Sequence, residues 1–312
     1  MKGKPVFCLG LTPALQRTVL LNSLQLNQVN RTRQVMESAS GKAVNIARSL
    51  VTLGTPADVS GFNGGDTGRR MVECLKVYGV GNALTPMASP TRICTTLLDQ
   101  RTKEVTEIIE EAPSVDLQLI KLMSNDASKR LMKAPLVIIA GTLPPFVSDH
   151  FYIKFAQDAE KAHVPLIIDS HGTALLHTLP FHPVLAKMNL HELGTTFGQK
   201  MTSEELIFES MREIFAKGAQ NVLVTDGANP AYLMTAEGIS TVPLPKIRNC
   251  LNPIGSGDCA TAGFAHAFLN KKPIAQCARY AMACGGANAE TLLPSDFAVR
   301  RVSALYKELQ AL

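Results

Sequence analysis

The stretch NPIGSGDCATAGFAHAF, residues 252–268, decides how the fold and the function of this chain are interpreted. Gly255, Ser256 and Gly257 lead directly into Asp258, and the Ala- and Gly-rich segment that follows has a composition compatible with a helix. Glycines let consecutive backbone N–H groups face one anion, and a helix N-terminus carries partial positive charge, so the stretch predicts a phosphate-binding site. The Lys of a G-x-x-x-x-G-K-[ST] loop is absent, and an acid stands in its place.

A carboxylate beside bound phosphate would repel it, so Asp258 needs a chemical role. The pattern indicates a base that takes a proton from a hydroxyl, while Gly255, Ser256 and Gly257 offer N–H groups to a phosphoryl group in transfer. The alternative is an aspartate that only caps a helix, which is a common arrangement.

Short apolar runs that end in small or polar residues are typical of strands buried on both faces of a parallel sheet. Helical patterns lie between such runs at residues 44–54, 150–164 and 203–218. This alternation predicts a doubly wound, mainly parallel α/β sheet, and we expect one domain over residues 1–312. The runs are residues 5–10, 136–141, 165–170, 184–189 and 221–227.

Two stretches fall outside this alternation. Residues 15–37 and 91–110 carry β-branched residues around polar turns, a pattern that predicts strand pairs. We interpret them as a small β lid over about residues 12–37 and 91–112, with ordinary hairpins at the domain edge as the alternative.

Composition and charge exclude several classes of protein. The net charge of +5 is spread without a basic run, so we expect no nucleic-acid partner. No apolar stretch reaches about 18 residues, and no secretory pattern opens the chain, so we expect no membrane span. The seven cysteines form no C-x-x-C pair, and we expect buried thiols in a cytoplasmic protein.

Ligands of open α/β sheets gather at the carboxyl ends of the strands. The residues that end the predicted strands are small or polar, as a binding site requires, although acids there can also cap turns. They are Gly141, Asp169, Ser170, Asn189, Thr225, Asp226 and Gly227.

The segment NPIGSGDCATAG resembles the C-terminal signature of the PfkB, or ribokinase-like, carbohydrate kinases, which centres on G-[AS]-G-D. SGKAVNIA, residues 40–47, is similar to the G-G-K-G-x-N-x-A of one branch, with Ser40 and Ala43 in place of glycines. The resemblance runs nearly the full length and is closest to 1-phosphofructokinase and tagatose-6-phosphate kinase. It implies the ribokinase-like fold and a catalytic Asp258 beside the anion-binding residues 255–257.

The resemblance also implies an acceptor site. Lys42 and Arg92 would hold the phosphate of a sugar phosphate, and Asn45 would contact sugar hydroxyls. Gln16 stands where the family has an Asp that grips the sugar, so it brings no charge. The implied acceptor residues are Gln16, Gly41, Lys42, Asn45, Arg92, Thr142 and Arg31, the last able to reach a neighbouring subunit's substrate.

On the nucleotide side, KMNLHEL (187–193) resembles K-P-N-x-x-E, which implies that Asn189 and Glu192 position Mg²⁺. Oxygen ligands suit that ion, although N-x-x-E spacing alone is common. The implied nucleotide-binding residues are Lys187, Thr225, Gly227 and Asn288.

The activity that the resemblance implies is ATP-dependent phosphorylation of fructose 1-phosphate, fructose 6-phosphate or tagatose 6-phosphate to the bisphosphate. It also implies a Mg²⁺ cofactor, a monovalent cation near the anion loop, and a homodimer formed through the lid. Two alternatives remain open. One is a kinase for an unphosphorylated sugar or nucleoside, and the other is a catalytically impaired sugar-binding regulator, which the substitutions Gln16, Ser40 and Ala43 suggest.

Overall fold

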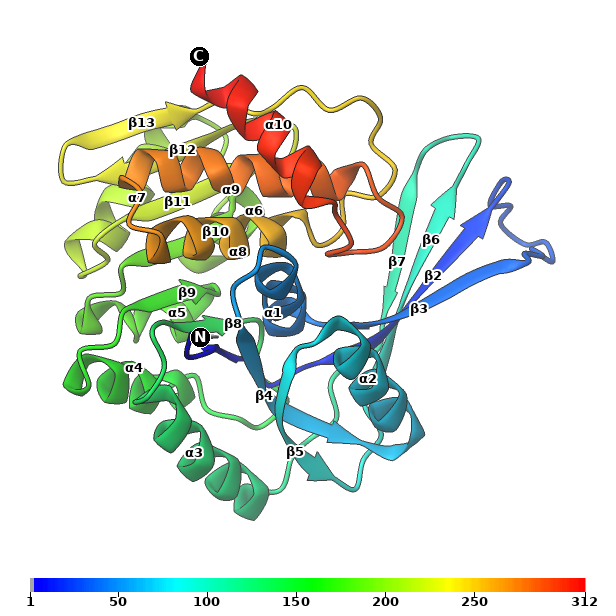
Figure 1. Cartoon of the computed structure of the whole chain (residues 1–312), viewed down its shortest axis with the longest axis horizontal. Coiled ribbons are helices and arrows are strands. Elements are labelled where there is room, and N and C mark those ends of the chain that lie inside the picture. Colours follow the sequence, from blue (N-terminus) through cyan, green and yellow to red (C-terminus); the bar gives the residue numbers. More distant parts are fainter. Residues whose placement is uncertain (1–2, 312) are drawn as a thin grey trace.

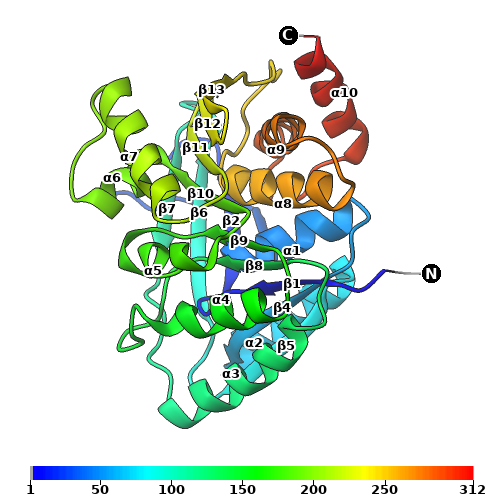
Figure 2. The ribbon, with the colours of Figure 1, turned by 90° about the vertical axis from the view of Figure 1, so that its left-hand side faces the viewer.

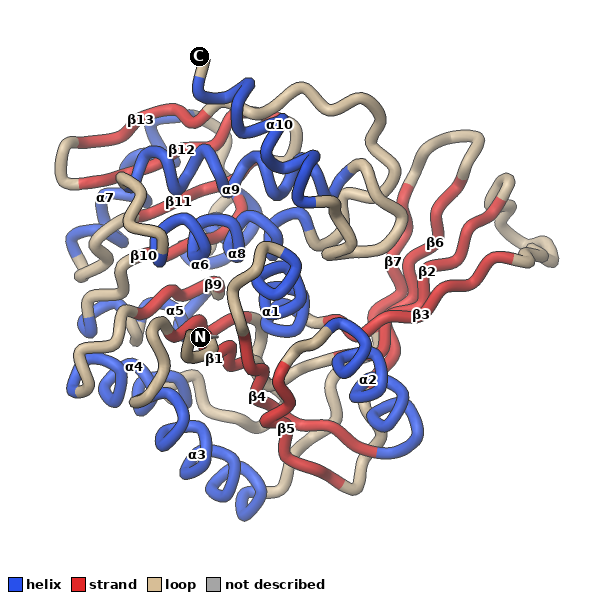
Figure 3. Tube along the Cα trace, viewed as in Figure 1, coloured by secondary structure: helices blue, strands red, loops and turns tan. Residues whose placement is uncertain are grey.

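The computed structural model describes residues 3–311, and a nine-stranded sheet forms its centre (Figures 1 and 3). Strands run parallel in the order β11-β10-β9-β8-β1-β4-β5, and β12 and β13 continue the sheet antiparallel beyond β11. The mainly parallel sheet predicted from the apolar runs is therefore confirmed. The strands are β1 Val6–Leu9, β4 Ala57–Gly64, β5 Gly81–Met87, β8 Val137–Ala140, β9 Leu166–Asp169, β10 Leu185–Asn189, β11 Val222–Asp226, β12 Asn229–Thr235 and β13 Gly238–Val242.

Helices cover both faces of this sheet, as Figure 2 shows for α8, α9 and α10 on one side and α6 and α7 on the other. Successive side chains of a strand point to opposite faces, so Val6 and Cys8 of β1 join one core while Phe7 and Leu9 join the other. The first layer holds α1 Lys42–Thr52, α2 Gly65–Tyr78, α8 Ser256–Leu269, α9 Ile274–Ala289 and α10 Val299–Gln310. The second holds α3 Leu117–Leu131, α4 Phe151–Lys161, α5 Gly172–Leu176, α6 Leu190–Phe197 and α7 Glu204–Ala216, with the short 3-10 helix η1 Leu179–Phe181.

A separate four-stranded sheet extends away from the main body and forms the lid (Figure 1). Its order is β3-β2-β6-β7, with β2 parallel to β6 and the outer pairs antiparallel. The strand pairs predicted outside the main alternation are therefore confirmed, although β3 continues beyond residue 37. The lid strands are β2 Ala14–Leu21, β3 Gln34–Ser40, β6 Arg92–Asp99 and β7 Val105–Ile109.

Four segments form the junction between the lid and the main body: residues 10–13, residue 41, residues 88–91 and residues 110–116. Residues 10–13 lead from β1 into β2, and Gly41 leads from β3 into α1. Gly41 has φ +104°, and a Cβ there would lie 2.9 Å from Pro13 Cα and 3.1 Å from the Thr12 carbonyl oxygen. Only glycine fits this close approach in the left-handed region, so Gly41 lets the β1–β2 and β3–α1 connections lie against each other.

The register of the parallel strands aligns their carboxyl ends. Asp169 is paired with Ala140 on one side and with Lys187 on the other, and Asn189 is paired with Thr225. The polar residues that end β8 to β11 therefore share one edge of the sheet, as the sequence predicted. Within residues 3–311, no helix combines the length and the hydropathy needed to cross a bilayer.

Candidate active site

The anion loop, residues 252–257, is held in shape by its neighbours. Gly255 adopts φ +80°, and a Cβ there would lie 2.9 Å from the Pro294 side chain. Asn252 stabilises the loop from inside, since its Oδ1 accepts from Ile254 N at 3.0 Å and its Nδ2 donates to the Leu292 carbonyl at 2.8 Å. The loop ends at the first turn of α8, where the Ser256 N–H donates to the Pro253 carbonyl at 3.1 Å and the other N–H groups, which have no acceptor within the helix, can bind an anion.

Asp258 lies in the first turn of α8 and is only 8% exposed. Its Oδ2 accepts a hydrogen bond of 2.7 Å from Asn45 Nδ2, so α1 holds the carboxylate of α8. Burial and the nearby Asp169 carboxylate raise the pKa of Asp258 to about 6, against the opposing effects of Lys42, Asn45 and Lys187. A carboxylate with a raised pKa is a stronger base than an ordinary aspartate and is still ionised at neutral pH.

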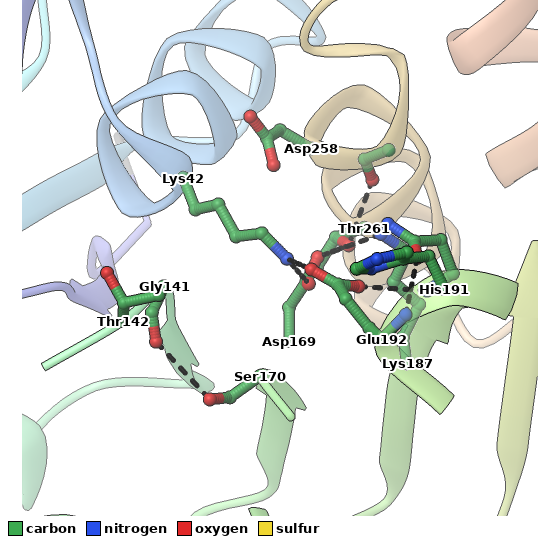
Figure 4. A network of polar contacts seen from close by, with 12 residues as sticks. Lys42, Gly141, Thr142, Asp169, Ser170, Lys187, His191, Glu192, Asp258 and Thr261 are labelled. Carbon is green, nitrogen blue, oxygen red and sulfur yellow. Dashed lines mark hydrogen bonds and ion pairs between the residues drawn. The ribbon is translucent and has the colours of Figure 1, made fainter. Parts of the chain in front are cut away.

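Asp169, at the end of β9, is fully buried and binds three side chains from three other elements. Its Oδ1 accepts from Lys42 Nζ at 2.8 Å, and its Oδ2 accepts from Lys187 Nζ at 3.1 Å and from Thr261 Oγ1 at 2.5 Å (Figure 4). Burial raises the pKa of Asp169, but the two ammonium groups and Thr261 outweigh it, so its pKa lies below the usual range. Asp169 is therefore an anion that links α1, β10 and α8.

Asn189 and Glu192 form a capping box at the start of α6. Asn189 Oδ1 accepts from Glu192 N at 2.8 Å, while Glu192 Oε2 accepts from Asn189 N at 2.9 Å. The N-x-x-E spacing thus has a structural role in this chain. The other oxygen of Glu192 accepts from Lys42 Nζ at 2.6 Å, which brings Glu192 to the same ammonium as Asp169.

These oxygen atoms fit the chemistry of Mg²⁺. The Lys42 ammonium lies between the carboxylates of Asp169 and Glu192, in a position where a hard cation finds two anionic oxygens. Residues 3–311 contain no group of three or more His, Cys, Asp or Glu residues arranged to hold a metal. An ion at this edge would therefore also need ligands from outside the chain, such as nucleotide phosphates or water.

The acceptor-side residues lie around the junction of lid and body. Arg92 begins β6, donating from Nη2 to the Thr12 carbonyl at 2.9 Å and from Nη1 to the Glu110 carbonyl at 3.2 Å, while its buried Nε has no partner among the described residues. Thr142 is exposed, and its hydroxyl lies 3.4 Å from that of Thr12. Gly41, Thr12 and Lys42 line one small hollow here.

Three predicted acceptor residues have environments that the sequence pattern did not indicate. Gln16 is buried in β2, and its Nε2 donates to Thr96 Oγ1 of β6 at 2.7 Å, so the amide is used inside the lid. Lys42 contacts two carboxylates. Arg31 is exposed in the connection between β2 and β3, which lies at the end of the lid away from the main body (Figure 1).

The predicted nucleotide-side residues lie in three places. Lys187 lies directly under the anion loop, since a Cβ at Gly257 would be 2.9 Å from its Nζ. Thr225 and Gly227 lie at the end of β11, and Gly227 is exposed with φ +55°. Asn288 is fully buried.

Asn288 supports the anion loop from below. Its Nδ2 donates to the Ile254 carbonyl and to Ser256 Oγ at 2.9 and 3.0 Å, while its Oδ1 accepts from Ser295 N at 2.7 Å. All three hydrogen bonds stay inside the protein, so the structure gives Asn288 the role of holding the loop in place.

Two residues of the site were not selected from the sequence. Asp169 was noted only as a strand-end acid, and its central position follows from a register that no local pattern reveals. Thr261 stands three residues after Asp258, a spacing that puts both on one face of α8, but a threonine in a small-residue helix carries no signal of its own.

Comparisons with known proteins bear on this geometry. The model of the pfkB family of carbohydrate kinases matches residues 5–296. Phosphofructokinase-2 from Escherichia coli in complex with potassium is similar in structure, with a TM-score of 0.88, 20% identity, and coverage of 99% of this chain and 100% of that one. The same protein in complex with fructose-6-phosphate matches with a TM-score of 0.86, 20% identity and the same coverage. A protein described as a possible 1-phosphofructokinase from Thermotoga maritima has a TM-score of 0.88, 21% identity and 97% coverage of both chains.

Proposed function

The chain belongs to the pfkB family of carbohydrate kinases and is an ATP-dependent sugar kinase, and we propose that its acceptor is a ketohexose phosphate. Fructose 1-phosphate, fructose 6-phosphate and tagatose 6-phosphate are the candidate acceptors, each giving a bisphosphate. The observation that carries the proposed chemistry is the buried Asp258 at the start of α8, beside the N–H groups of the anion loop. The cations Lys42 and Arg92 on the acceptor side favour a phosphorylated sugar.

In this mechanism Asp258 accepts the proton of the attacking hydroxyl, and Asn45 keeps the carboxylate oriented through its hydrogen bond. The N–H groups of Gly255, Ser256 and Gly257 stabilise the negative charge on the transferred phosphoryl group. Lys187, under Gly257, adds positive charge to the same space.

The remaining predicted residues bind the two substrates. Arg92 and Lys42 hold the acceptor's phosphate, Arg31 reaches from the lid to the acceptor's phosphate in the neighbouring subunit, and Gly41 and Thr142 face the sugar. Thr225 and Gly227 face the nucleotide. Glu192, Asp169 and Asn189 would hold Mg²⁺, which would supply positive charge beside the nucleotide phosphates. Closure of the lid would exclude water as a competing acceptor.

The central test is an ATP-consumption assay over the three ketohexose phosphates, with fructose, ribose and adenosine as unphosphorylated acceptors. We expect turnover with at least one ketohexose phosphate and little with the others. Turnover restricted to an unphosphorylated acceptor would support the sugar or nucleoside kinase instead. A sugar phosphate that binds in calorimetry without turnover would support the regulator.

Arg92→Ala sharpens this test because it removes the guanidinium group that is proposed to bind the acceptor's phosphate. Loss of a hydrogen bond to a charged group corresponds to a KM increase of about 10- to 100-fold for the sugar phosphate. Arg69→Ala is the matched control, because Arg69 is exposed on α2 and pairs with Asp66 at 2.7 Å. An equal KM in both variants would remove Arg92 from the acceptor site.

Further parts of the proposal are a homodimer through the lid, a monovalent cation near the anion loop and a cytoplasmic location. The lid supports the dimer because Val35, which is 42% exposed, and Ile108, which is 57% exposed, point to the same face of its sheet. The potassium complex of the Escherichia coli relative supports the cation. Rates measured with K⁺ and with tetramethylammonium test the cation, since only K⁺ should raise the rate.

A further inference from the structure

The Lys42 side chain makes the contact on which this inference rests. It extends from the first turn of α1 to the carboxyl edge of the sheet, where Nζ lies 2.8 Å from Asp169 Oδ1 and 2.6 Å from Glu192 Oε1 (Figure 4). We name these two ion pairs the Lys42 bridge. Glu192 is one of the residues predicted on the nucleotide side, so the bridge joins an acceptor-side cation to the two carboxylates that suit a divalent ion.

The other partners of the two carboxylates do not depend on Lys42. Asp169 Oδ2 stays bound to Lys187 and Thr261, and Glu192 Oε2 stays bound to the Asn189 backbone N–H. Withdrawal of Lys42 would therefore leave both side chains in place and free one oxygen of each. Those two oxygens already face one point, because a single ammonium contacts both.

The charges of the bridge make the Lys42 ammonium compete with a metal ion for the two carboxylates. Asp169 and Glu192 carry two negative charges, and Lys42 and Lys187 carry two positive charges, so this group of four is neutral with the bridge closed. A divalent cation that approached it would meet an ammonium at the position that it needs. With Lys42 withdrawn, the group carries a net negative charge that attracts the ion.

We propose that the Lys42 bridge makes binding of a divalent cation depend on the acceptor: the phosphate of the sugar draws Lys42 away, and the freed carboxylates then bind the metal. This inference rests on the proposed function, in which Lys42 contacts the acceptor's phosphate. Lys42 can make this exchange because its side chain is 27% exposed and flexible, whereas Lys187 is 2% exposed and fixed under the anion loop.

Thermodynamic linkage makes the effect reciprocal. If the sugar phosphate tightens metal binding by some factor, the metal tightens sugar-phosphate binding by the same factor. The enzyme would then assemble its metal site mainly when an acceptor is present, which disfavours nucleotide hydrolysis in its absence.

The experiment measures Mn²⁺ binding to the full-length protein by electron paramagnetic resonance, without nucleotide. For the unsubstituted protein, we expect a saturating ketohexose phosphate to lower the Mn²⁺ dissociation constant by about 5- to 100-fold, within the usual range of coupling. Lys42→Met should bind Mn²⁺ with similarly increased affinity before any sugar is added, and the sugar phosphate should add little. Circular dichroism checks that the variant is folded.

Two further variants locate the effect. Lys42→Arg keeps a cation at the bridge and should bind Mn²⁺ as weakly as the unsubstituted protein, while Lys42→Met with Glu192→Gln should lose the gain. Lys271→Met, a change at an exposed lysine beyond α8, is the control and should change nothing.

The inference is overturned if a sugar phosphate that demonstrably binds leaves Mn²⁺ affinity unchanged, or if Lys42→Met binds Mn²⁺ no more tightly than the unsubstituted protein. Absence of turnover with every ketohexose phosphate would instead refute the proposed acceptor. The comparison of Lys42→Met with the unsubstituted protein, made without sugar, would still decide whether the bridge competes with metal.

Discussion

Replacement of Asn45 by Leu should move the pH dependence of the reaction in a direction that the structure fixes. Asn45 Nδ2 donates 2.7 Å to the carboxylate of Asp258, and this bond lowers the pKa of a group that burial and Asp169 raise to about 6. A hydrogen bond to a charged group contributes about 1.5–3 kcal/mol, which corresponds to roughly 1–2 pH units. Without it, the carboxylate should hold its proton up to a pH of about 7–8.

Because Asp258 must be ionised to accept a proton, activity rises with pH through its pKa and is lost below it. The assay measures kcat/KM for ATP-dependent phosphorylation as a function of pH between 5 and 9. The midpoint of the acidic limb of this profile reports the pKa of the base in the free enzyme. We expect a midpoint near the value of about 6 for the unsubstituted protein and about 1–2 units higher for Asn45→Leu.

The position of this midpoint is a sharper readout than the rate, because a merely structural defect lowers kcat/KM at every pH. Lys42, Lys187 and Asp169 also act on Asp258, and all three remain in the variant. Ser49→Ala on the same helix is the control, since Ser49 Oγ lies 3.3 Å from the Cys259 thiol and its loss should leave the midpoint in place. An unchanged acidic limb in Asn45→Leu would refute the reasoning.

Three further outcomes follow from other contacts. Asp258→Asn should lose several powers of ten in kcat, and near-normal turnover would exclude Asp258 as the base. The pKa of Asp258 is raised from 3.8 to about 6 in the folded state, so the ionised acid destabilises the fold as pH rises through that window. The free energy of unfolding of the variant in urea should therefore increase by up to about 3 kcal/mol at pH 7.5 and by much less at pH 4. Thr261→Val removes the 2.5 Å bond to Asp169 and should lower the free energy of unfolding by about 1–3 kcal/mol, whereas equal stability would show that the bond is dispensable. Ile108→Asp, in the exposed face of β7, should give a monomer in sedimentation, while Val77→Asp on α2 should not; equal masses would argue against a lid dimer.

The sequence predicted the parts of the fold whose signals are local. Apolar runs such as residues 136–141 identified buried strands, because a strand covered on both faces must be apolar throughout. β4 and β5 were not predicted, since residues 57–64 and 81–87 mix Gly, Asn and Pro with their apolar residues. Their place beside β1 comes from long-range pairing.

The candidate site divides in the same way. Asp258 and Gly255 were predicted because they belong to one short motif of consecutive residues. The contacts of Lys42 and Asn45 were not, because a side chain's partner depends on elements far along the chain: Asp169 and Glu192 for Lys42, and α8 for Asn45. Asn288 was predicted from the family resemblance, but its hydrogen bonds to the anion loop depend on how α9 packs against α8.

The bond from Thr261 to Asp169 fastens the helix that bears the proposed base to the strand that bears the buried anion. The proposed base therefore belongs to the main body, whereas the lid is a separate sheet joined to that body at a junction of four connecting segments that include Gly41. Divergence in sugar preference can then accumulate around the lid and this junction, where Gln16, Ser40 and Ala43 lie, without disturbing the apparatus that handles the nucleotide.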